Sequence, residues 1–286
     1  SPGSPEPTEV ELRGSVLQAG QQPVFPRAIE HRGEPFAYLA ELGFNTVRLA
    51  RPPSPRELAE ASAAGMWLIC PPPDVRAGRS IGPSHDRVIC WDVGERLRGR
   101  DLAALRELSA AIDRADEQSA RPLLAHADES LRAFSRVVDV MLMTRAPIGS
   151  SFELSAYGEW LDGRRQLLRP GTPIWTTIQT EPLNAQYHAW RAVASGIVEP
   201  QQSRLLAYAA IGSGARALIF RSHSRLDADD AATNLRRLAL ELINREMLLI
   251  EPWLAVSGHP TPINVDQANV RATMFPSQRS HLIVAT

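Results

Sequence analysis

The chain has 286 residues, of which 44% are hydrophobic and 22% are charged, with 31 basic and 32 acidic side chains and a net charge of -1. This composition is typical of a globular protein, and two cysteines are too few for a disulfide framework or a thiolate metal cluster. The near-neutral charge and the lack of any run of about 20 apolar residues lead us to expect neither a nucleic-acid partner nor a membrane partner.

The first residues, 1–8, are rich in Pro and Ser and are typical of a linker. We assign residues 1–20 to this linker and a lead-in strand. A start without Met and an end inside the apolar run 281–286 lead us to expect further domains of the same longer chain. We also expect an extracytoplasmic location, secreted or periplasmic.

Short apolar runs alternate with helical patterns through the middle of the chain. Ser54-Pro55-Arg56-Glu57 combines a capping box with Pro at the first helical position, which predicts a helix start. Gly43 and Gly65 each end a helix just before a strand-like run. The predicted strands are 24–29, 44–49, 66–70, 88–93, 122–126, 137–142, 174–178 and 217–220.

Eight mostly continuous apolar strands indicate a parallel sheet that is buried on both faces, and eight βα units predict a (β/α)₈ barrel over residues 21–255. A doubly wound open sheet is the alternative, but the first strand runs into residues 30–35 without the Gly-rich loop that such a sheet usually carries. The runs 270–275 and 281–286, with a turn between them, predict that residues 256–286 begin a β-rich, sandwich-like domain.

In a (β/α)₈ barrel the active site lies at the C-terminal ends of the strands, so polar residues at these positions are candidates. A salt bridge or a solvated loop residue is the ordinary explanation for each one taken singly. The candidate ligand-binding residues are Glu30, His31, Arg48, His126, Arg221 and His223, together with Tyr157 as an aromatic platform for a sugar. Trp160, Tyr187 and Trp190 are weaker aromatic candidates.

Two carboxylates follow strands on opposite sides of the predicted barrel. Glu95 follows the fourth strand and Glu181 follows the seventh. Two carboxylates in one cleft supply the proton donor and the nucleophile that glycoside hydrolysis requires. The sequence therefore predicts a carbohydrate ligand and a retaining two-carboxylate glycosidase, with no cofactor and no metal.

Several segments resemble the retaining glycoside hydrolases built on (β/α)₈ barrels, the clan that includes β-galactosidases and cellulases. Residues 44–49 are similar to the second-strand signature of this clan, and residues 91–95 and 173–181 are similar to its fourth-strand and seventh-strand segments. Residues 214–221 resemble the eighth strand of the family 42 β-galactosidase type. The resemblance implies that Glu95 is the acid/base, that Glu181 is the nucleophile and that Arg48 supports Glu181.

The fourth-strand segment departs from the clan pattern. The clan has Asn before the acid/base Glu, a frame that places Glu95 at the Asn position and Arg96 at the Glu position. An Arg stays charged and does not donate the proton. If Glu95 is the acid, we expect the charge of Glu181 to raise the pKa of Glu95. We expect Arg48 to lie beside Glu181 and to lower the pKa of Glu181. Asp92 should point to the other face of its strand, because side chains alternate along a strand.

Two other functions compete with hydrolysis. The first is a catalytically inactive, glycosidase-like barrel, a degenerate member of the clan, that binds carbohydrate or serves as a scaffold. The second is a metal-dependent hydrolase that uses His31, His126 and His223. That class usually has a His-x-His pair on the first strand, whereas residues 30–33 contain only one His.

Overall fold

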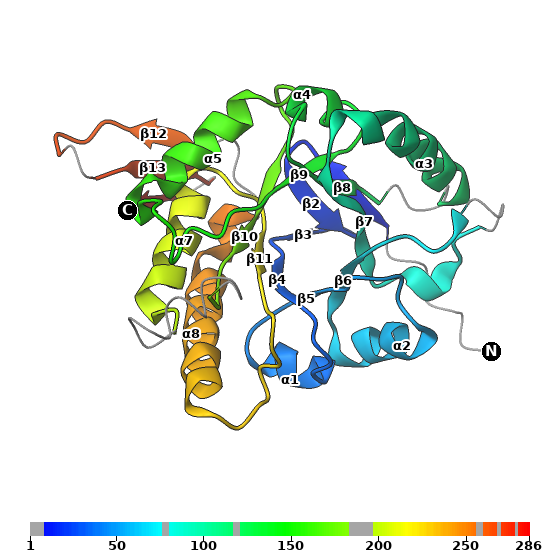
Figure 1. Ribbon diagram of the computed structural model, residues 1–286, viewed down its shortest axis with the longest axis horizontal. Helices are drawn as coiled ribbons and strands as arrows, with labels where there is room; N and C mark the ends of the chain where they lie inside the picture. The colour runs from blue at the N-terminus through cyan, green and yellow to red at the C-terminus, as the bar shows by residue number, and fades with distance from the viewer. Residues whose placement is uncertain are drawn as a thin grey trace.

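The structure is a computed structural model that describes residues 9–75, 80–116, 121–182, 197–255, 260–267, 270–277 and 280–286. Its centre is a closed barrel of eight parallel strands, ordered β10-β11-β4-β5-β6-β7-β8-β9 (Figure 1). The fold prediction is confirmed. The barrel strands are β4 (Arg27–Glu30), β5 (Thr46–Arg48), β6 (Trp67–Cys70), β7 (Val88–Leu97), β8 (Leu123–Ala127), β9 (Val140–Met143), β10 (Ile174–Ile178) and β11 (Leu218–Phe220).

Helices surround this barrel and connect most of its strands. The described helices are α1 (Phe36–Glu41), α2 (Pro55–Ala64), α3 (Leu102–Ala115), α4 (Leu131–Phe134), α5 (Tyr157–Gln166), α7 (Pro200–Gly212) and α8 (Ala231–Leu254), with 3-10 turns at Pro83–His85, Gly99–Asp101 and Leu154–Ala156. The capping box of α2 forms as predicted, because Ser54 accepts from the Glu57 amide while the Glu57 carboxylate accepts from the Ser54 amide. Gly65 ends this helix with a left-handed φ of 67°.

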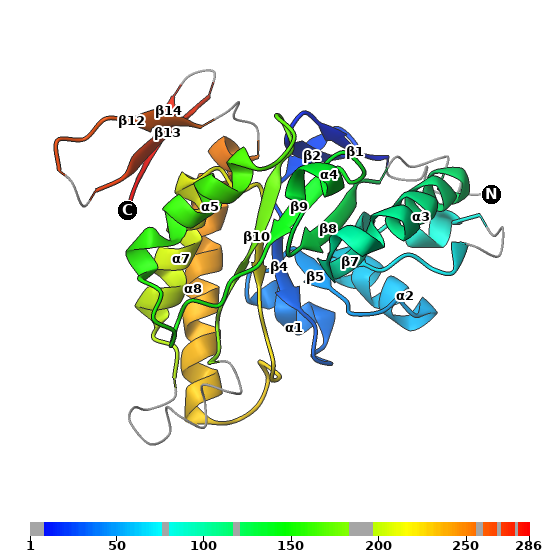
Figure 2. The same ribbon diagram turned by 45° about the horizontal axis from the view of Figure 1, so that its top comes forward.

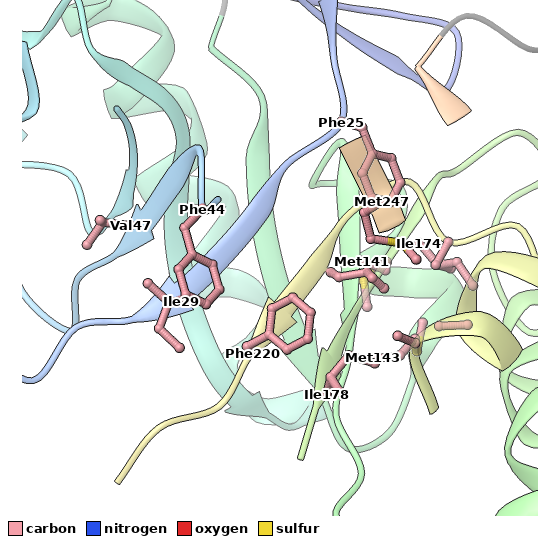
Figure 3. Close-up of a cluster of buried hydrophobic side chains, with 14 of the residues drawn as sticks. Phe25, Ile29, Phe44, Val47, Met141, Met143, Ile174, Ile178, Phe220 and Met247 are labelled. Atoms are coloured by element: carbon pink, nitrogen blue, oxygen red, sulfur yellow. The ribbon is translucent and has the colours of Figure 1, made fainter. Parts of the chain in front are cut away.

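Side chains that alternate along the strands form two apolar layers. The outer layer packs the barrel against its helices and includes Ile29, Val47, Ile178 and Phe220 (Figure 3). Phe44 meets Phe220 edge-to-face, with ring centroids 5.7 Å apart. These contacts fix the strand ends that carry the polar residues described below.

A three-stranded antiparallel sheet precedes the barrel and consists of β1 (Val10–Arg13), β2 (Val16–Ala19) and β3 (Gln22–Val24). Its buried Val10 and Leu17 pack with the inner layer of the barrel, which includes Ile69 and Trp175. Figure 2 shows this sheet at one end of the barrel. The expectation of a single lead-in strand and of a first barrel strand at 24–29 needs correction, because Val24 belongs to β3 and the barrel begins at β4.

The chain ends in a second antiparallel sheet, formed by β12 (Thr261–Ile263), β13 (Ala272–Pro276) and β14 (His281–Ala285). The two predicted strands near the end are thereby confirmed, with Pro276 paired with His281 across the turn. Thr273 donates to the carbonyl of Gly212 at 2.8 Å, and Phe275 is buried, so this sheet packs on the helices of the barrel (Figure 2).

Candidate functional site

A cavity of about 630 Å³ lies at the C-terminal ends of the barrel strands. Its wall combines charged side chains from four strand ends with a run of prolines. The lining residues used below are Glu30, His31, Arg32, Arg48, Leu49, Pro71, Pro72, Pro73, Asp92, Val93, Glu95 and Arg221. A volume of this size is typical of a small-molecule site.

The guanidinium of Arg48 lies at the centre of the charged wall and binds three carboxylates. It contacts Asp92 through Nη2 at 2.6 Å and through Nε at 2.9 Å. It also contacts Glu30 at 3.3 Å and forms a short contact with Glu95. The Arg48 side chain is only 6% exposed, so its charge is compensated by these carboxylates rather than by solvent.

The Glu30 carboxylate also contacts three donor groups other than Arg48. Arg32 lies 3.2 Å away, and Nε of Arg221 lies 3.5 Å away. The backbone amide of Ser222 also donates to this carboxylate at 3.3 Å. Glu30 is therefore held in place by Arg48 at the end of β5 and by groups that follow β4 and β11.

A bulge in β7 brings Asp92 and Glu95 to the same cavity. The register against β8 shifts between Asp92 and Gly94, where Gly94 has a φ of 155°. An unbroken strand would place residues 92 and 95 on opposite faces, and the extra residues reverse that alternation. The expectation that Asp92 points to the other face is therefore wrong.

Glu95 lines the cavity, whereas Arg96 is not among the lining residues. The Arg96 side chain is 76% exposed and lies 3.6 Å from Asp128. Burial alone would raise the pKa of Glu95, but the charge and hydrogen bond of Arg48 outweigh burial and lower it. The expected rise in the pKa of Glu95 is therefore wrong, because its dominant charged neighbour is a cation.

Glu181 lies in a different environment. It accepts hydrogen bonds from the amide of His223 at 2.5 Å and from the Ser224 hydroxyl, and it forms an ion pair with Arg236. These groups outweigh the effect of burial and lower its pKa. The expected lowering of the Glu181 pKa is found, but Arg48 is not its cause. The predicted contact between Arg48 and Glu181 is therefore wrong.

Glu95 and Glu181 line separate cavities in the described part of the chain. The cavity that includes Glu181 has a volume of about 230 Å³ and is also lined by Thr180, Ser224 and Arg236. The ends of β7 and β10 therefore do not direct these two carboxylates into one shared pocket.

The remaining predicted residues divide between the cavity and other locations. His31 and Arg221 line the cavity. His126 is near it, 3.7 Å from Asp128, and burial lowers its pKa. His223 contributes its backbone amide to Glu181.

Tyr157 is not available to stack on a ligand. It is fully buried, and its hydroxyl pairs with the Thr176 hydroxyl at 2.9 Å and donates to the Thr177 carbonyl at 3.0 Å. The expectation that it binds substrate is therefore wrong, because α5 packs this ring against the outside of the barrel. Trp160 stacks on the same ring at 5.6 Å, and Tyr187 and Trp190 lie outside the described residues.

The site residues that sequence reasoning did not select are Asp92, Arg32 and the proline run. Gly94, two residues after Asp92, is the signal that indicates a bulge. Within the described ranges, no group of three or more His, Cys, Asp or Glu side chains is arranged to hold a metal ion. No described helix is both long enough and apolar enough to cross a membrane.

The barrel resembles those of several glycoside hydrolases of known structure. A family 5 mannosidase from Rhizomucor miehei matches with a TM-score of 0.59 at 10% identity, over 87% of this chain and 100% of that one. A β-glucuronidase from Ruminococcus gnavus matches with a TM-score of 0.55 at 13% identity, over 84% of this chain and 52% of that one. A structure described as a putative α-L-fucosidase from Bacteroides thetaiotaomicron matches with a TM-score of 0.54 at 12% identity, over 79% of this chain and 96% of that one.

At these identities the likeness shows the fold. The chain spans about half the length of the Ruminococcus gnavus β-glucuronidase and 34% of a β-glucuronidase from Parabacteroides merdae. No protein-family model matches the sequence. No curated protein sequence matches it either.

Proposed function

We propose that this chain is a glycosidase-like barrel that binds a carbohydrate without hydrolysing it. The proposed binding site is the cavity of about 630 Å³ around Arg48, which we call the Arg48 cavity. The observation that carries the proposal is the contact of Arg48 with Glu30, Asp92 and Glu95. The charge and hydrogen bond of Arg48 lower the pKa of Glu95 and so favour its charged form. The cavity then presents fixed acceptors rather than a proton donor.

Retaining hydrolysis requires one carboxylic acid that holds its proton and one carboxylate nucleophile about 5–5.5 Å away. Arg48 lowers the pKa of Glu95, which is the opposite of what the acid requires. Glu181 is held by Ser224, His223 and Arg236 beside the smaller cavity. Both observations favour binding over cleavage.

The chemistry of the wall suits a polyhydroxylated ligand. Sugar hydroxyls both donate and accept, so carboxylates such as Asp92 and Glu95 and the guanidinium of Arg221 offer complementary partners. The prolines 71–73, Leu49 and Val93 provide apolar surface for the C–H faces of a sugar ring. The likeness to glycosidase barrels supports the same ligand class.

Retaining hydrolysis by Glu95 and Glu181 is the competing function. It is favoured by the position of these residues after β7 and β10, the fourth and seventh strands of the barrel. It requires Glu95 to hold a proton despite its contact with Arg48, and it requires one ligand to reach both Glu95 and Glu181. The family 42 likeness and the extracytoplasmic location remain predictions alongside it.

Calorimetric titration of the chain with a panel of neutral and acidic monosaccharides and oligosaccharides tests the proposal. We expect saturable binding that Glu95→Gln weakens and that Glu181→Gln leaves unchanged. Glu107→Gln, on the exposed surface of α3, is the matched control. Binding by none of the sugars, or equal binding by Glu95→Gln and the unaltered chain, would contradict the proposal.

A further inference from the structure

A third cavity, distinct from those lined by Glu95 and by Glu181, lies at the other end of the barrel and is lined by three arginines. It has a volume of about 90 Å³ and is bordered by Ile174, which begins β10, and by the residues just before β11. Ser15, in the turn between β1 and β2, forms another part of its wall. We call it the basal cavity; its lining includes Ser15, Arg165, Arg169, Ile174, Gly214 and Arg216.

Two of the three guanidinium groups are held by the fold. Arg165 donates to the Ser213 carbonyl and to Asp162, both at 2.9 Å. Arg216 is 5% exposed and donates to the Leu254 carbonyl at 2.9 Å. Gly214 permits this arrangement, because a Cβ there would lie 2.8 Å from Nη1 of Arg165.

The third guanidinium, that of Arg169, belongs to an exposed residue after α5. Within the described residues, its side chain makes no direct ion pair, and it interacts electrostatically with the Asp139 carboxylate. Its backbone amide is fixed by the Ser135 hydroxyl at 2.8 Å. Arg169 is therefore positioned at its backbone while its charged end is available to a ligand.

The carboxylates near the arginines of the basal cavity lie outside its lining, where Asp162 pairs with Arg165 and Asp139 interacts electrostatically with Arg169. No Asp or Glu is among the described residues that line it. Asp162, the carboxylate partner of Arg165, is shared with Arg271. An anion in the cavity would therefore meet guanidinium groups and no carboxylate among the described lining residues.

We propose that the basal cavity binds a tetrahedral oxyanion, phosphate or sulfate, either free or as the terminal group of a monoester. A volume of about three water molecules accommodates one such group. Planar guanidinium groups match its oxygens with paired, charge-assisted hydrogen bonds. The ligand would connect Ser15 of the first sheet with the barrel and with α5.

Calorimetric titration with sodium phosphate, sodium sulfate and a sugar phosphate, at constant ionic strength set with sodium chloride, tests this site. We expect saturable binding that Arg169→Gln weakens by about tenfold, the loss of one charge-assisted contact. Arg164→Gln makes the same charge change on α5 outside the cavity and should bind like the unaltered chain. Tighter binding of the monoester or of free phosphate identifies the source of the group.

Heat denaturation gives a second measurement that does not depend on sugar binding. Phosphate should raise Tm above the value in sodium chloride for the unaltered chain and for Arg164→Gln, and less for Arg169→Gln. Absence of saturable binding at millimolar phosphate would overturn the proposal. So would a loss of binding in Arg221→Gln but not in Arg169→Gln, which would place the anion in the Arg48 cavity.

Discussion

Arg48 and Glu95 extend from the second and fourth strands of the barrel and form an ion pair inside the cavity at its mouth. The Glu95 side chain is 51% exposed, whereas that of Arg48 is 6% exposed. The pair therefore joins an anchored cation to a carboxylate that a ligand can reach.

The ionisation of Glu95 should follow from this contact. Because Arg48 lowers the pKa of Glu95, its carboxylate stays charged to lower pH in the folded chain than in the unfolded chain. The linked stabilisation is fully present above the unfolded pKa and is lost as the pH falls through the folded pKa. Carbon NMR titration of labelled glutamate, with and without urea, measures both values; a folded pKa above the unfolded one would contradict the assignment.

Removal of the central cation should be costly. Arg48→Met leaves Glu30, Asp92 and Glu95 without their shared cation, and Glu30 and Asp92 are 10% and 8% exposed at their side chains. We expect the free energy of unfolding to fall by about 3–5 kcal/mol, as for other broken buried ion pairs. Urea denaturation measures the change.

Arg51→Met is the matched control for that experiment. Arg51 pairs with Glu57, but its side chain is 63% exposed, so its loss should cost no more than about 1 kcal/mol. Similar losses in the two variants would show that Arg48 does not organise the cavity.

Glu181 should act as a local stabilising group. Glu181→Gln weakens the acceptor of the His223 and Ser224 amides and removes the ion-pair partner of Arg236, whose side chain is 8% exposed. We expect a loss of about 1–3 kcal/mol in stability without a change in sugar affinity. Urea denaturation and calorimetry on the same sample measure both quantities, and a weakened affinity would place Glu181 in the ligand site.

The first sheet should be part of the barrel core. Leu17 is 2% exposed and packs on the inner layer with Ile69 and Trp175, so Leu17→Ala should cost about 2–5 kcal/mol. Leu238→Ala, at a position 55% exposed on α8, removes the same atoms from the surface and is the control. Equal Tm values for the two variants would show that the sheet is only loosely attached.

The eight barrel strands were predictable because strands buried on both faces are mostly continuous apolar runs, such as Val140–Met143. The first sheet was not, because β1 to β3 are short and separated only by the turns at Gly14 and Gly20. The position of Asp92 depends on the bulge at Gly94, and the partners of Arg48 depend on contacts across the barrel. Neither follows from strand alternation alone.

The central claim is that the Arg48 cavity binds carbohydrate and leaves it intact. Native mass spectrometry of the chain after prolonged incubation with a mixture of oligosaccharides measures binding and cleavage together. We expect intact oligosaccharide bound to the unaltered chain, less of it bound to Glu95→Gln, and no shorter products. Shorter products that disappear in both Glu95→Gln and Glu181→Gln would contradict the claim and establish the two-carboxylate hydrolase instead.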